Sequence, residues 1–187
     1  MGLSRGDLLV RGGKLALAGS ALAVVPAARA ATPSDNDLAW ARLLVVAELL
    51  AIDFYEHALR SRRVKPAAEL YRALADEGRH RRAVAAILIA AGQTPPGTAD
   101  VDFVYPKRAF SSHHAIVELG ARLESIFLGA YLGAVAGFDV EDLKLTASRA
   151  AASEAQHLSA LTGRVGPAFP RALSIDQSSN ALDAYTA

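Results

Sequence analysis

The chain has 187 residues, enough for one domain with short extensions, and its composition, 52% hydrophobic with few aromatics, favours helices over sheet. The formal net charge is only +1, so the composition gives no indication of a nucleic-acid partner. The absence of cysteine excludes disulfides, iron–sulfur clusters, thiolate metal ligands and lipidation at a cysteine.

Residues 1–30 have the pattern of an export signal. A basic start precedes a short apolar segment at residues 15–25, and Ala28-Arg29-Ala30 resembles a cleavage site. The segment is too short to be a stable transmembrane anchor, and no other stretch is long and apolar enough. We therefore expect export to the periplasm or the extracellular space. Gly6 stands where a twin-arginine signal has its second arginine, so the Sec route and a degenerate twin-arginine route both stay open.

Residues 34–165 are predicted to form a bundle of four helices. Apolar residues recur at helical spacing in four segments, at about 34–61, 66–91, 112–137 and 140–163. Ser34 is placed to cap the first helix, and Pro66 suits the first turn of the second. The connection over residues 93–111 is long for a compact domain, and a crossover along the bundle would account for it.

The rest of the chain, residues 166–187, is expected to be a tail in which residues 174–185 could form a short helix docked on the bundle. In the third helix, Gly120, Gly129 and Gly133 lower the intrinsic helix propensity. Their presence indicates that another part of the chain packs closely against this helix.

Glutamate and histidine lie three positions apart at two places in this pattern. Glu77 and His80 have this spacing in the second predicted helix, and Glu154 and His157 repeat it in the fourth. Residues three apart share one side of a helix, so each pair can converge on one point. A carboxylate and an imidazole that meet in this way suit a first-row transition metal.

A single glutamate lies on the apolar face of each of the other two helices: Glu48 in the first and Glu124 in the third. The order of one Glu followed by Glu-x-x-His therefore occurs twice, and a tyrosine, Tyr55 or Tyr131, follows each lone glutamate by seven residues. Four carboxylates in an apolar interior repel one another unless protons or metal ions neutralise them. Two divalent cations would balance their charge.

This set of residues resembles the ferritin-like di-iron or di-manganese carboxylate proteins, and most of all exported bacterial ferritin-like domain proteins. The resemblance covers about residues 35–165. It implies an all-α fold, a ferritin-like four-helix bundle with a long crossover between helices two and three. It also implies six metal ligands: Glu48, Glu77, His80, Glu124, Glu154 and His157.

The resemblance further implies roles for these ligands. Glu77 and Glu154 would bridge two iron ions, or two manganese ions. The remaining ligands would complete one ion each: Glu48 with His80, and Glu124 with His157. The implied function is oxidation of Fe(II), or reduction of dioxygen or peroxide, with no catalytic residue beyond the metal ligands.

Other functions stay open at this stage. The bundle can be a non-catalytic envelope or stress-related module that binds metal weakly or for structure. A storage cage is a further alternative, but the predicted tail and export signal argue against it. A homo-oligomer is also left open. The segment Asp76-Glu77-Gly78-Arg79-His80 also resembles a motif of di-iron monooxygenases. The second Glu–His pair lacks the corresponding Asp and Arg, so we do not assign an oxygenase.

Three groups near the predicted ligands also carry hypotheses. Asp76 is a candidate to orient a ligand histidine, with a surface acid as the alternative. The two tyrosines lie two turns from the glutamates that precede them and are assigned to core packing rather than redox chemistry. Asp53 and His57 are expected to form a solvated pair on the outer face of the first helix.

His113, at the start of the third helix, projects inward. It lies far along the helix axis from Glu124, so we leave it out of the predicted site.

Overall fold

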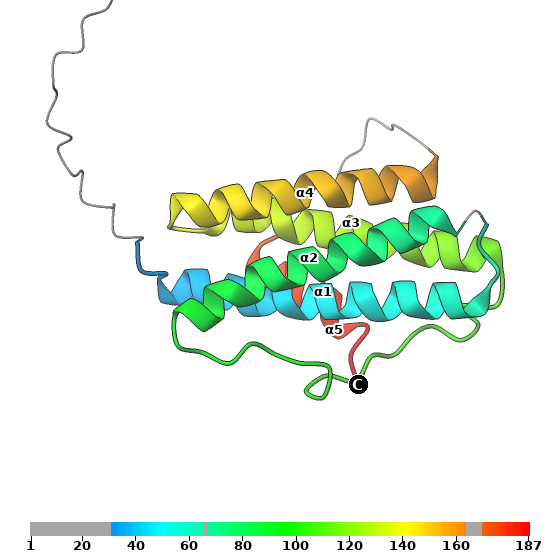
Figure 1. Ribbon diagram of the computed structural model, residues 1–187, viewed down its shortest axis with the longest axis horizontal. Helices are drawn as coiled ribbons and strands as arrows, with labels where there is room; N and C mark the ends of the chain where they lie inside the picture. Colours follow the sequence, from blue (N-terminus) through cyan, green and yellow to red (C-terminus); the bar gives the residue numbers. More distant parts are fainter. Residues whose placement is uncertain (1–30, 66, 164–169) are drawn as a thin grey trace, which may run out of the picture. The chain divides into compact units, whose positions relative to one another are not determined.

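The computed structural model describes residues 31–65, 67–163 and 170–187. The predicted export signal at residues 1–30 lies outside the described residues and stays a prediction, and so does the position of Pro66. The helices of the described part are α1 (Asp35–Ser61), α2 (Ala68–Ala90), α3 (His113–Gly137), α4 (Glu141–Thr162) and α5 (Ile175–Asp183). The first four form two hairpins, α1–α2 and α3–α4, that lie along one another (Figure 1). The predicted all-α bundle of four helices is confirmed.

The start of α1 is fixed by reciprocal hydrogen bonds. The backbone N–H of Asp37 donates to Ser34 Oγ (3.1 Å), and the N–H of Ser34 donates to Asp37 Oδ2 (2.8 Å), so both ends of a capping box are closed. The other carboxylate oxygen of Asp37 accepts from the N–H of Asp139 (2.7 Å). The cap of α1 therefore also joins the turn between α3 and α4.

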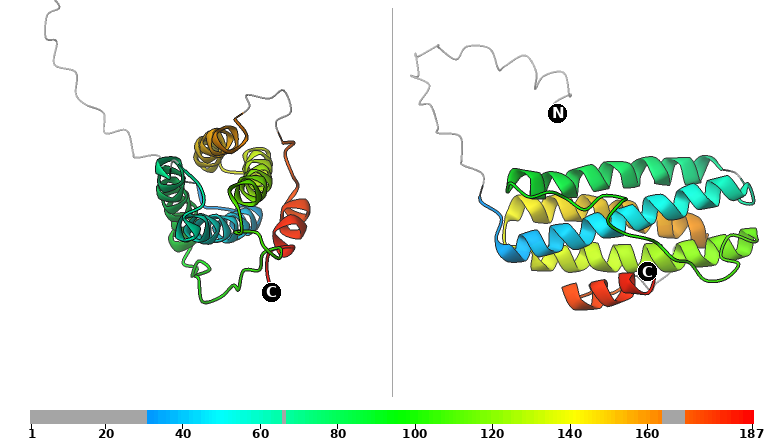
Figure 2. Two further views of the ribbon diagram at one scale, coloured as in Figure 1. Left: turned by 90° about the vertical axis from the view of Figure 1, so that its right-hand side faces the viewer. Right: turned by 90° about the horizontal axis from the view of Figure 1, so that it is seen from below.

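The connection between α2 and α3 crosses the length of the bundle alongside α1 (Figures 1 and 2). It also pairs with the C-terminus, because the N–H of Val104 donates to the carbonyl of Tyr185 (2.9 Å) and the N–H of Ala187 donates to that of Asp102 (3.0 Å). The crossover thus has backbone partners of its own, which a long connection needs if it is to be ordered.

The crossover changes the surroundings of Asp53 and His57. The two side chains do pair, with 3.2 Å between Asp53 Oδ2 and His57 Nδ1. The Tyr105 hydroxyl donates to Asp53 (2.7 Å), and the Phe110 ring stacks on His57 with centroids 5.1 Å apart. The pair is therefore partly covered rather than solvated as expected, because helical periodicity cannot show which face a distant loop covers.

The tail packs on α1 and α3, where α5 lies beside both helices in the end view of Figure 2. Leu182 and Tyr185 are buried, and the N–H of Leu173 donates to the carbonyl of Gly129 (2.9 Å). A Cβ atom at Gly133 would overlap the backbone of Leu173, and one at Gly129 would lie 2.9 Å from Leu173 Cγ. The close packing that the glycines indicated is therefore present, and the tail is one of the partners.

Two hydrophobic clusters divide the interior of the bundle. One contains Trp40, Tyr131 and Phe138, and the other contains Phe54 and Tyr55 together with Leu182 of α5 and Tyr185. By length and composition α3 could cross a membrane, but 61% of its most apolar window is buried in the bundle. Burial between the two clusters accounts for its apolar character.

The contact between α3 and the tail predicts opposite effects for two helical glycines. Gly133→Ala should destabilise the fold by about 1–3 kcal/mol, because the new methyl group must displace the backbone at Leu173. Gly78→Ala is the control: its Cβ would lie 3.6 Å from the end of Arg82, so it should stabilise α2 by about 0.5–1 kcal/mol. Urea unfolding measures both, and a Gly133→Ala protein as stable as wild type would contradict the packing.

Candidate metal centre

Six ionisable side chains from four helices meet inside the bundle, between the two hydrophobic clusters. Helices α1 and α3 each contribute one glutamate, and α2 and α4 each contribute a Glu–His pair. The glutamates are 0–2% exposed and the histidines only slightly more, at 13% for the His80 side chain and 9% for that of His157. All six residues expected from the sequence are brought together: Glu48, Glu77, His80, Glu124, Glu154 and His157.

The two carboxylates of the Glu–His pairs lie between the two imidazoles. Glu77 directs Oε2 to His80 Nδ1 (3.1 Å) and Oε1 to His157 Nδ1 (2.9 Å). Glu154 does the same, with Oε1 at 2.9 Å from His80 Nδ1 and Oε2 at 3.4 Å from His157 Nδ1. Each of these carboxylates therefore presents one oxygen to each half of the centre.

The other two glutamates belong to one half each. Glu48 Oε1 lies 3.8 Å from His80 Nδ1, and Glu124 Oε2 lies 3.8 Å from His157 Nδ1. The side chains thus form two overlapping groups, in each of which the ligand atoms lie within 4.8 Å of one another. Glu77 and Glu154 are the members that the two groups share.

The donor set fits metal ions. Six buried atoms lack a hydrogen bond of good geometry within the described residues: Glu48 Oε2, Glu77 Oε1, Glu124 Oε2, both carboxylate oxygens of Glu154 and Nδ1 of His157. All of them except Glu48 Oε2 take part in the carboxylate–imidazole ion pairs of 2.9–3.8 Å given above. A buried polar atom without a partner is costly. Carboxylate oxygens and imidazole nitrogens are ligands that iron and manganese accept, so coordination would satisfy these atoms.

The ferritin-like domain family matches the chain over residues 36–167, which includes all six of these side chains. The chain belongs to this family. No curated protein matches it. The resemblance noted in the sequence is therefore confirmed at the level of the ferritin-like fold, and the carboxylate–histidine cluster of this ferritin-like bundle is compatible with two metal ions.

Protons compete with metal ions for the ferritin-like centre. Burial, and then repulsion from neighbouring carboxylates, raises the pKa values of Glu48 and Glu124 well above the usual range. Burial lowers the pKa of His80, but hydrogen bonds and charge attraction from Glu154 and Glu77 outweigh burial and raise this pKa to about 9. Burial also opposes ionisation of Glu154, yet the two imidazoles lower its pKa to about 2. The raised pKa values of both histidines and of Glu48 and Glu124 therefore favour their protonated forms, which lowers the negative charge of the centre.

Each lone glutamate is also held by a tyrosine of the opposite hairpin. The Tyr55 hydroxyl on α1 donates to Glu124 on α3, and the Tyr131 hydroxyl on α3 donates to Glu48 on α1. Burial and the adjacent carboxylate raise the pKa of both tyrosines, so each hydroxyl keeps its proton and remains a donor. The tyrosines are buried, as expected of core packing, but the sequence reasoning missed these contacts because it compared each tyrosine only with the glutamate of its own helix.

Asp76 extends the centre on one side. Its Oδ2 lies 3.5 Å from Nε2 of His157, the nitrogen that faces away from the carboxylates, and its Oδ1 pairs with Arg79. Asp76 is therefore placed to orient a ligand histidine, which was one of the two hypotheses for it. Ser153 occupies the position before Glu154 that Asp76 occupies before Glu77, and no carboxylate within the described ranges forms an ion pair with Nε2 of His80.

The pKa shifts predict how the stability of the metal-free protein depends on pH. His80 has a folded pKa of about 9 against an ordinary value of 6.5, so its protonated form contributes stability that is fully present below pH 6.5. That contribution is lost as the pH rises from 6.5 to 9, and the melting temperature of chelator-treated protein should fall over this range. A flat or rising melting temperature between these pH values would contradict the protonated centre.

The crossed tyrosine contacts predict which metal each tyrosine affects. Tyr55→Phe removes the donor to Glu124 and Tyr131→Phe removes the donor to Glu48, so each should weaken one of two metal-binding steps by roughly 10-fold. Tyr71→Phe, at an exposed position on α2, is the control. Titration calorimetry with Mn(II) separates the steps, and equal affinities in all three variants would show that the hydroxyls do not support the ligands.

Proposed function

We propose that this ferritin-like protein binds two iron ions, or two manganese ions, and uses them to oxidise Fe(II) or to reduce dioxygen or peroxide. The proposal rests on the orientation of Glu77 and Glu154: each carboxylate directs one oxygen to His80 and the other oxygen to His157. This is the arrangement that two bridging carboxylates require. Glu48 with His80, and Glu124 with His157, would complete one ion each.

A bound pair of iron or manganese ions would supply the electron transfer, which no side chain of the chain can supply alone. The protein holds and orients the ligands: Tyr55 and Tyr131 fix the two outer glutamates, and Asp76 holds the ring of His157. Because metal ligands must be deprotonated, loading would release protons from the outer glutamates and from the histidines. Apolar side chains of the two hydrophobic clusters surround the four glutamates, while the His80 and His157 side chains stay 13% and 9% exposed.

Metal stoichiometry in single variants tests the dinuclear site. Glu77→Ala and Glu154→Ala should reduce the metal content from about two ions per chain to near none, because each removes a ligand from both ions. Glu48→Ala and Glu124→Ala should each leave about one ion per chain, because each removes a ligand from one ion only.

Glu118→Ala is the matched control for Glu124→Ala, since Glu118 lies on the same helix with 61% of its side chain exposed. Elemental analysis of protein dialysed against Mn(II) gives the metal content. If all four variants retain the wild-type content, the acids are structural and the proposal fails.

The redox part has its own test, which is consumption of dioxygen or peroxide by the Fe(II)-loaded protein. The Glu77→Ala variant is the control. A wild-type protein that binds about two ions per chain and consumes neither oxidant would favour the non-catalytic binding module instead.

A further inference from the structure

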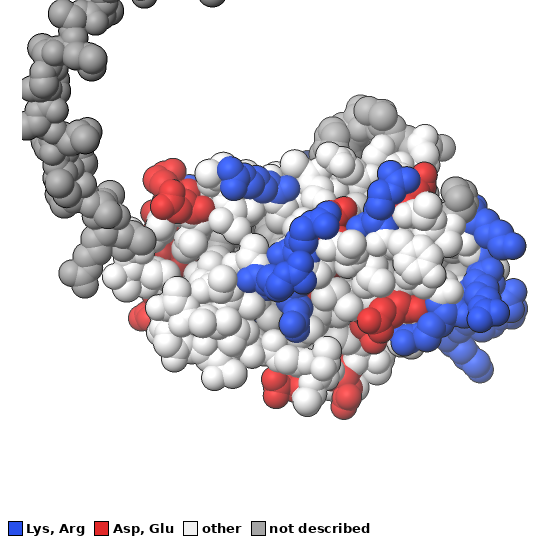
Figure 3. All heavy atoms as spheres, in the orientation of Figure 1, with Lys and Arg blue, Asp and Glu red and all other residues white. Residues whose placement is uncertain are grey.

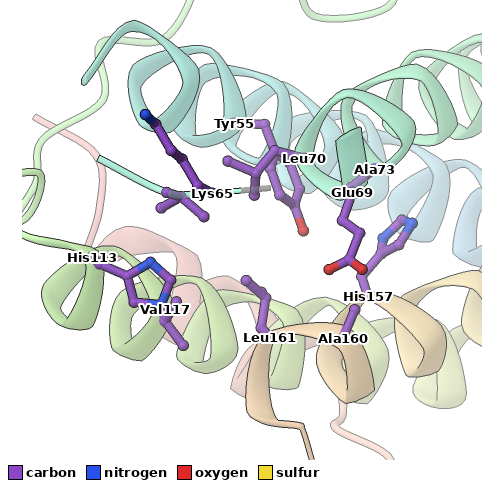
Figure 4. A pocket seen from close by; sticks show the side chains of 11 residues that line it. Tyr55, Lys65, Glu69, Leu70, Ala73, His113, Val117, His157, Ala160 and Leu161 are labelled. Atoms are coloured by element: carbon purple, nitrogen blue, oxygen red, sulfur yellow. The ribbon is translucent and has the colours of Figure 1, made fainter. Parts of the chain in front are cut away.

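A cavity of about 230 Å³ lies at the end of the bundle where α1 ends and α2 begins. Its lining includes the rings of Tyr55 and His157; Lys65 and His113 lie on the side away from His157, and Glu69 lies on the same side as His157 (Figure 4). His113, which sequence reasoning left out of the site, thus lines a space that leads to a candidate metal ligand. The four helices of the bundle all contribute to this wall.

The cavity reaches one half of the centre only. Tyr55 and His157 both belong with Glu124, whereas neither His80 nor Tyr131 lines this space. At the opposite end of the bundle, Trp40 and Phe138 are buried and fill the interior next to Tyr131. A molecule in the cavity would therefore lie beside the ion assigned to Glu124 and His157, and not beside the other.

The deep part of the cavity suits an apolar body. Leu70 and Ala73 are buried there, and Val117 and Leu161 add further aliphatic surface. The Tyr55 hydroxyl already donates its proton to Glu124, so it has no proton to donate to a deep ligand. A molecule that enters this part would gain mainly from burial of apolar area.

The mouth of the cavity favours a negative charge. Lys65 lines it and makes no ion pair within the part of the chain that the structure describes, and Arg62 and Arg63 are exposed in the same turn. Figure 3 shows Lys and Arg side chains gathered over this end of the bundle. Glu69 is the acid of the lining, and Figure 4 shows it on the opposite side from Lys65. Within the lining the charges of Lys65 and Glu69 balance, so the excess of positive charge at this end comes from Arg62 and Arg63 beside the cavity. Excess positive charge near a cleft attracts anions.

We propose that this cavity binds a small organic anion, with its apolar body against Leu70 and Ala73 and its carboxylate at the Lys65 end. The ligand would lie beside the ion held by Glu124 and His157, so this placement rests on the proposed function. The proposal gives the two ions different surroundings, because His157 lines this cavity and His80 does not.

Fluorine NMR of the full chain with three probes tests the class of ligand. The probes are para-fluorobenzoate, neutral fluorobenzene and the cation para-fluorobenzylammonium. The benzoate should bind most tightly, and Lys65→Gln should weaken its binding by roughly threefold while Glu69→Gln strengthens it by a similar factor. Neither variant should change the binding of fluorobenzene. Tighter binding of the cation, or no binding of the benzoate, would overturn the proposal.

Two exposed alanines of α4 locate the binding. Ala160 lines the cavity and Ala152 does not. Ala160→Trp should abolish benzoate binding by filling the space, and Ala152→Trp should leave it unchanged. Equal binding by the two variants would show that the probe binds elsewhere and would overturn the proposal.

Metal substitution tests the position beside the ion. In Mn(II)-loaded protein the paramagnetic ion should broaden the fluorine signal of bound benzoate, and in Zn(II)-loaded protein it should not. Absence of broadening with about two Mn(II) per chain would overturn the placement. If the protein takes up no metal, the proposed function fails on its own account, and the Lys65, Glu69 and Ala160 variants of metal-free protein still decide whether the cavity binds an anion.

Discussion

The structure depends on the burial of four carboxylates around two imidazoles. Like charges so close together in an apolar interior cannot all be ionised unless opposite charge lies among them. The centre meets this requirement with protons on Glu48, Glu124 and the histidines, and it has the donor atoms to meet it with two divalent cations. The protons hold the ligands close together, but Glu48 Oε2 has neither a hydrogen bond nor an imidazole contact within the described residues.

The two hairpins are joined through this centre rather than merely packed around it. Glu77 of the first hairpin faces His157 of the second, and Glu154 faces His80 in return. The tyrosines also join the hairpins, because each tyrosine hydroxyl donates a hydrogen bond to the lone glutamate of the other hairpin. Neither hairpin can complete its half of the site alone, so the site requires the assembled bundle.

The two halves of the centre have matching ligands, but the residues around those ligands differ. Asp76 supports His157, but Ser153 stands at the corresponding place in α4. The cavity opens beside His157, while Trp40 and Phe138 fill the other end of the bundle. Both differences fall on the half of the centre that contains Glu124 and His157. A duplicated set of ligands thus lies in unequal surroundings, which is the condition for two like ions to have different tasks.

Local patterns in the sequence determined the helices and the face on which each ligand lies. A Glu and a His three positions apart must share one side of a helix, and four acids on apolar faces must meet if those faces pack together. Contacts between helices were decided only by the tertiary structure: Tyr55 with Glu124, Asp76 with His157, and the crossover over Asp53. They depend on how far each helix is shifted along its neighbour and where a loop runs. The shift between helices and the path of the loop result from the packing of many side chains at once, so they cannot be predicted from the spacing of residues within one segment.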